Sequence, residues 1–150
     1  MDFSTAAAIR DDRDDTGAFT DETGRKDFFI QRDGECFAGT HLLIDVRDGS
    51  RLDDLDHIDA TLRACVEAAG ATLLSIDLHH FTPNGGVSGV AILAESHISI
   101  HSWPEYGYAA LDVFMCGAAR PQDAVPVLRQ AFGTDNVHVE EIRRGRGMVG

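Results

Sequence analysis

Short apolar runs separated by Gly, Pro and Asn dominate the chain from about residue 37 to its end. Runs rich in Val, Ile and Leu that are bounded by such turn residues are typical of β-strands. The pattern therefore predicts strands over residues 39–47, 72–81, 87–95, 97–103, 108–116 and 137–144.

Two segments have helical period instead. Between Ser50 and Gly70 the apolar side chains that recur every three or four residues, and so share one helix face, are Leu52, Leu55, Ile58, Leu62 and Val66. We expect Ser50 to cap this helix and Gly70 to end it. A second, shorter helix is predicted from Pro121 to about Phe132.

The order of these elements indicates an α+β fold. A strand, a helix, four strands, a helix and a final strand predict a mainly antiparallel or mixed sheet with helices on one face. The other face is left to be buried, and a second subunit could bury it. A chain of 150 residues suffices for one such domain, which we expect to span residues 37–150.

Residues 1–36 differ from the rest in composition. They contain ten acidic and five basic residues and have neither helical nor strand period. We expect a flexible acidic leader in this segment. It contains Lys26, the only lysine of the sequence, so we expect no core lysine that could hold pyridoxal phosphate.

Charge and apolar content exclude several classes of protein. The formal net charge of -12 argues against nucleic acid as a partner, because phosphate binding requires clustered Lys and Arg. No apolar run approaches the roughly 20 residues that span a bilayer, and no secretory signal is visible, so we expect a cytoplasmic protein. Three cysteines without framework spacing argue against a disulfide scaffold.

The densest set of reactive side chains lies between Gly85 and Gly117, in GGVSGVAILAESHISIHSWPEYGYAALDVFMCG. The pair Glu95–Ser96 interrupts the strand-like runs there. A serine hydroxyl can attack the preceding carbonyl when a sharp turn presents the two groups, which converts the amide to an ester. Elimination then leaves dehydroalanine, which hydrolyses to a pyruvoyl group. This built-in ketone can form a Schiff base with an amine, as pyridoxal phosphate does.

This segment, together with HHFTPNGGVSGVAILA before it, resembles the bacterial S-adenosylmethionine decarboxylase proenzyme family almost residue for residue. The resemblance spans about residues 37–145. It implies that the chain cuts itself between Glu95 and Ser96 into a β chain of residues 1–95 and an α chain of residues 96–150. Ser96 would become the pyruvoyl cofactor, which replaces any external one.

The resemblance also implies roles for further residues. His101 matches the base of the cutting reaction, and Ser88 matches a hydroxyl that assists it. Cys116 matches the acid that returns a proton to the product carbon. Phe81 resembles the aromatic residue that packs on the adenine, and Glu105 the carboxylate that holds the ribose hydroxyls.

At the level of the whole molecule, the resemblance implies a two-layer α/β sandwich whose sheets pair in a homodimer, with the site at or near the dimer interface. The substrate would be S-adenosylmethionine, and its decarboxylated product would serve spermidine synthesis. Ser102 and Met115 stand where threonine is more usual, and neither position carries chemistry.

Two alternatives remain open from the sequence. The same chemistry could act on a basic amino acid such as arginine or ornithine, or the chain could be an inactive regulatory subunit. We also considered a metal held by the histidines His79, His80, His97 and His101. Adjacent residues of a strand point to opposite faces, so His79 and His80 cannot share one site, and we expect no functional metal.

Overall fold

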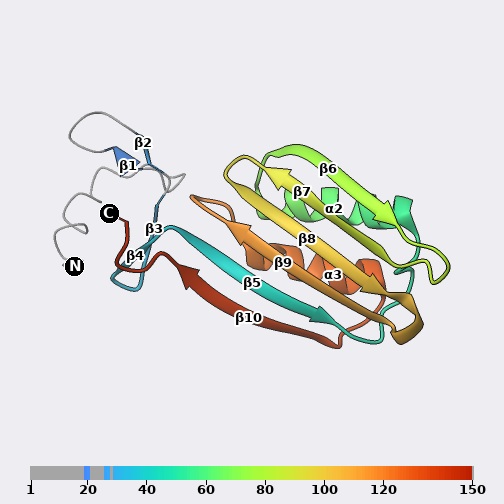
Figure 1. Ribbon diagram of the computed structural model, residues 1–150. Helices are drawn as coiled ribbons and strands as arrows, with labels where there is room; N and C mark the ends of the chain where they lie inside the picture. The colour runs from blue at the N-terminus through green and yellow to red at the C-terminus, as the bar shows by residue number, and fades with distance from the viewer. Residues whose placement is uncertain (1–18, 21–25, 28, 150) are drawn as a thin grey trace.

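The computed structural model describes residues 19–20, 26–27 and 29–149. A six-stranded sheet in the order β10-β5-β9-β8-β7-β6 forms one layer, and two α-helices cover one of its faces (Figure 1). The strands are β5 (Gly39–Val46), β6 (Leu73–His80), β7 (Val87–Leu93), β8 (Ser96–Trp103), β9 (Tyr108–Met115) and β10 (Val137–Arg144). The helices are α2 (Leu55–Ala69) and α3 (Ala124–Phe132), with short 3-10 turns η2 (Pro104–Tyr106) and η3 (Pro121–Asp123).

Every neighbouring pair of strands in this sheet is antiparallel. The predicted α+β class, the mainly antiparallel sheet and the helices on one face are therefore confirmed. No helix among the described residues is long and apolar enough to cross a membrane.

The core lies between the sheet and the helices. Alternate side chains of the central strands are buried there, including Ile44 of β5 and Ile98 of β8, and they pack with Leu62 of α2 and Phe132 of α3. The intervening side chains lie on the opposite face, which we call the open face because no helix of the described residues covers it (Figure 1).

Helix α2 begins later than predicted. Its cap is Asp54, whose side chain accepts a hydrogen bond of 3.0 Å from the backbone N–H of His57. Ser50, the predicted cap, instead donates to the carbonyl of Phe132 at 3.2 Å. The prediction was wrong because Arg51 has a φ of 61°, which breaks the helical conformation between Ser50 and the true start. Gly70 ends the helix as expected, at a φ of 73°.

An ordered hairpin precedes the predicted start of the domain. Strands β3 (Ile30–Arg32) and β4 (Glu35–Phe37) pair with each other, and two shorter strands, β1 (Phe19–Thr20) and β2 (Lys26–Asp27), also pair. Arg143 of β10 lies over the ring of Phe37 and binds Glu35 at 2.8 Å. The ordered structure thus includes residues that we expected in the leader, whose first 18 residues lie outside the described part.

Candidate active site

A two-residue turn between β7 and β8 presents the Glu95–Ser96 bond. Leu93 and Ser96 are paired across the hairpin, so Ala94 and Glu95 form its tip. Glu95 has a φ of 62°, a left-handed conformation that costs an L-residue roughly 1–2 kcal/mol. The carbonyl that precedes Ser96 thus belongs to a sharply turned and strained residue.

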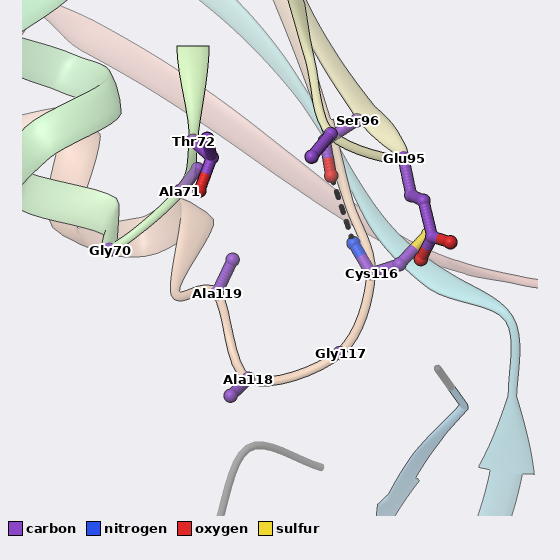
Figure 2. A pocket seen from close by; sticks show the side chains of 10 residues that line it. Gly70, Ala71, Thr72, Glu95, Ser96, Cys116, Gly117, Ala118 and Ala119 are labelled. Atoms are coloured by element: carbon purple, nitrogen blue, oxygen red, sulfur yellow. Dashed lines mark hydrogen bonds between the residues drawn. The ribbon is translucent and has the colours of Figure 1, made fainter. Parts of the chain in front are cut away.

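Ser96 lines a cavity of about 420 Å³ at this end of the sheet. The cavity is lined by the end of α2, by Glu95 and Ser96, and by the loop from Cys116 to Ala119 (Figure 2). The backbone N–H of Cys116 donates a hydrogen bond of 3.3 Å to the Ser96 Oγ, drawn as a dashed line in Figure 2. This contact orients the serine hydroxyl from the neighbouring strand end.

The thiol of Cys116 lies in the same cavity, on the side of Glu95 (Figure 2). Burial raises the pKa of Cys116, and the negative charge of Glu95 raises it further. At neutral pH the group is therefore a thiol rather than a thiolate, which is the form that can donate a proton.

A second group of the predicted residues gathers at the far end of the same strands. Ser88 Oγ and His101 Nδ1 are 2.9 Å apart, because the two residues are directly paired between β7 and β8. Together with Phe81 and Glu105 they line a cavity of about 240 Å³. Phe81 is 48% exposed, so its ring is available to a ligand.

The two groups do not meet within one chain. Ser96 and His101 are separated by five residues of extended strand, which corresponds to about 16 Å. They also point to opposite faces, because Ser96 is paired with the buried Leu93 whereas His101 is paired with Ser88 of the open face. The predicted site residues therefore lie in two separate groups, which we call half-sites: Glu95, Ser96 and Cys116 in one, and Phe81, Ser88, His101 and Glu105 in the other.

A third cluster was missed by the sequence analysis. On the open face, Asp112 Oδ2 lies 2.6 Å from His41 Nε2 and 2.9 Å from His97 Nε2. Among the described residues, these three form the group of His, Cys, Asp or Glu side chains whose ligand atoms could hold a metal ion, all within 4.8 Å. They come from β5, β8 and β9, and only the register of these strands aligns them.

The histidines that we weighed as a metal set do not form such a group. The ring of His79 packs against Phe81, with centroids 4.4 Å apart, and His101 binds Ser88. His97 instead forms a hydrogen bond with Asp112.

Comparison with known proteins points to one family. A family model described as S-adenosylmethionine decarboxylase matches residues 40–145. A protein of Acidithiobacillus ferrooxidans named S-adenosylmethionine decarboxylase proenzyme is 47% identical over 100 residues, covering 66% of this chain and 74% of that protein. A Methanococcus vannielii protein of the same name is 46% identical over 110 residues, covering 71% of this chain and 89% of that protein.

A solved structure agrees with these matches. The crystal structure of the adenosylmethionine decarboxylase from Aquifex aeolicus superposes with a TM-score of 0.66 at 31% sequence identity. The superposition covers 73% of this chain and 92% of that one.

Proposed function

This chain belongs to the S-adenosylmethionine decarboxylase family, and from that premise we propose that it decarboxylates S-adenosylmethionine with a pyruvoyl group made from its own Ser96. The observation that carries the proposal is the strained turn at Glu95, which presents the bond to be cut at the mouth of the cavity that holds Cys116. Family membership favours S-adenosylmethionine over arginine or ornithine as the substrate.

The cutting reaction uses groups already placed at the turn. Ser96 Oγ attacks the Glu95 carbonyl carbon, and the amide is replaced by an ester. A base removes the proton from the Ser96 Cα, the ester C–O bond breaks, and Glu95 keeps both oxygens as a new carboxylate. Water addition and loss of ammonia then convert the dehydroalanine at residue 96 to the pyruvoyl group. The N–H of Cys116, which already binds Ser96 Oγ, holds the attacking atom in place.

During turnover the pyruvoyl ketone supplies the electron sink for loss of carbon dioxide. Cys116 then returns a proton to the substrate carbon, and its raised pKa keeps it protonated for this task. Phe81 offers an exposed ring on which the adenine can stack, and Glu105 offers carboxylate oxygens that can accept hydrogen bonds from the ribose hydroxyls.

A homodimer would unite the two half-sites. The structure separates His101 and Ser88 from the Ser96 of the same chain, although the proposed chemistry needs all three together. The open face also exposes apolar side chains that a partner sheet would cover, among them Leu43, Ile92 and Trp103. An antiparallel two-fold pairing of open faces brings the His101 end of one sheet to the Ser96 end of the other. We expect this dimer to act in the cytoplasm.

Mass spectrometry of the purified chain tests the proposal. We expect two fragments, residues 1–95 and residues 96–150, the second beginning with a pyruvoyl group. The sample should release carbon dioxide from S-adenosylmethionine and not from arginine or ornithine. Ser96→Ala should remain uncut and inactive, whereas Ser75→Ala, a serine change on strand β6, should be cut as in the wild type. An intact chain of 150 residues that still decarboxylates the substrate would exclude the self-cutting mechanism.

A further inference from the structure

We infer that Asp112 is a positioning residue for the cutting reaction: through hydrogen bonds to His97, His41 and Ser99 it fixes the start of strand β8, and with it Ser96, beside Cys116. This inference rests on the proposed function and assigns a role to residues that the proposed chemistry does not use.

The carboxylate of Asp112 gathers donors from three strands. Oδ2 lies 2.6 Å from His41 Nε2 on β5 and 2.9 Å from His97 Nε2 on β8. The hydroxyl of Ser99, also on β8, donates to Oδ1. Both oxygens of Asp112 are thus occupied, and one side chain of β9 ties together the neighbouring strands β5, β9 and β8, in the half of the sheet that carries Ser96.

A neighbouring arginine defines the proton positions in this network. Arg144 Nη1 lies 3.0 Å from His41 Nδ1, and a guanidinium can only donate. His41 Nδ1 is therefore the acceptor, and its proton sits on Nε2, where it is donated to Asp112. Partial burial acts to raise the pKa of Asp112, but the hydrogen bonds from Ser99, His97 and His41 outweigh it and hold the pKa below its usual range. The acceptor is thus an ionised carboxylate at neutral pH.

The same arginine argues against a metal ion at this cluster. A histidine that binds a metal through Nε2 leaves that atom unprotonated and usually donates its other ring N–H to an acceptor. Here His41 Nδ1 accepts from Arg144 and so carries no proton. Metal binding through Nε2 would therefore leave the ring without a proton on either nitrogen. The arrangement fits a hydrogen-bonded network, and a cation would have to displace it.

Two of the residues bound to Asp112 are close in sequence to the bond to be cut. His97 directly follows Ser96, and it is paired with Phe114 on β9. Phe114 packs against the rings of both His41 and His97, with centroids 5.6 and 6.0 Å away. Two residues farther along, Cys116 donates its N–H to Ser96 Oγ. The hydrogen bond between His97 and Asp112 therefore fixes the position of Ser96 Oγ relative to the backbone N–H of Cys116.

The test compares cutting rates of freshly synthesised chains. Asp112→Asn should slow cutting about 10- to 100-fold, the range expected when a hydrogen bond to a charged group is lost. His97→Ala should also slow it, and the double variant should be no slower than Asp112→Asn alone, because the contact that His97→Ala removes is already lost in Asp112→Asn. Asp77→Asn, which removes a charge from strand β6 of the same sheet, is the matched control and should cut at the wild-type rate.

A spectroscopic measurement separates positioning from general loss of structure. In the uncut Ser96→Ala background, the ¹⁵N shifts of the ring nitrogens should report His41 with its proton on Nε2, and Asp112→Asn should change the His41 and His97 signals while the melting temperature stays close to that of the parent. Wild-type cutting in folded Asp112→Asn, or stoichiometric Zn²⁺ binding by the parent that Asp112→Asn abolishes, would overturn the inference. An uncut wild-type chain would instead count against the proposed function itself.

Discussion

Ser96 and His101 stand on the same strand, β8, five residues apart and on opposite faces. Their closeness in sequence becomes about 16 Å in space, because an extended strand advances about 3.3 Å per residue. A reaction that needs both groups at one atom must take them from two chains.

Complementation between two inactive variants tests this division. Ser96→Ala retains His101, and His101→Ala retains Ser96, so a heterodimer has one complete site. Coexpression in equal amounts should restore about a quarter of wild-type activity, because half of the dimers are mixed and each has one working site of two. The His101→Ala chain should be the one that is cut, as shown by mass. If no cut chain appears in the mixture, each chain completes its own site.

Cys116→Ser should separate the cutting reaction from turnover. The backbone N–H that binds Ser96 Oγ remains, so the variant should still cut itself. Turnover should fall by about 100-fold or more, because a hydroxyl is a far weaker acid than a thiol. Protonation on the ketone side would also convert the pyruvoyl group to alanine, which the mass of the α chain would reveal during turnover. Wild-type turnover with an intact pyruvoyl group would exclude Cys116 as the acid.

Glu95→Gln should move the titration of the Cys116 thiol in the uncut chain. Burial raises the pKa of Cys116, and the negative charge of Glu95 raises it further. Removing this charge lowers the pKa toward the ordinary value of about 8.5, so the thiolate should form at a lower pH than in the parent. The pH dependence of Cys116 alkylation is measured on the uncut Ser96→Ala chain, with Glu67→Gln on the exposed side of α2 as the control. An unchanged profile would show that Glu95 does not act on the thiol.

The cap of helix α2 offers a test of the fold. Asp54→Ala should lower the urea midpoint of the uncut Ser96→Ala chain more than Ser50→Ala does, because Asp54 caps the helix. The side-chain hydrogen bond from Arg51 and that from the His57 backbone lower the pKa of Asp54. The stabilisation is therefore present above the unfolded pKa of about 3.9 and is lost as pH falls through the lower folded pKa. The difference between Asp54→Ala and its parent should shrink in acid.

The strands were predictable because their apolar runs and turn residues are local signals. Predicted and observed bounds agree within two residues, as in 108–116 against Tyr108–Met115. The cap of α2 was not predictable from Ser50 alone, since the residue type of Arg51 gives no sign of its positive φ. The hairpin of β3 and β4 was hidden because its apolar residues are few and aperiodic, and contacts from Arg143 at the far end of the sequence help to hold it.

The candidate site shows the same limit. Serine, histidine and cysteine could be singled out because they lie in one dense motif, but the motif does not show that strand geometry divides them into two half-sites. The cluster of His41, His97 and Asp112 was invisible because its members are spread over three strands and meet only through the sheet register. The local pattern of apolar and turn residues predicts the strands. The side-chain contacts between strands depend on the pairing register, which the local pattern does not reveal.

The turn at Glu95 also bears on whether the cut can be undone. In the uncut chain Glu95 is held in its left-handed conformation by the hairpin on either side of it. Once it becomes a chain end, its backbone can relax, and the roughly 1–2 kcal/mol held in the turn is no longer recoverable. Resealing would require the loose end to be bent back and its conformational freedom surrendered, in addition to reversing the chemistry. By the proposed mechanism, loss of ammonia and this relaxation together make maturation a one-way step, and the cut enzyme cannot return to its uncut precursor.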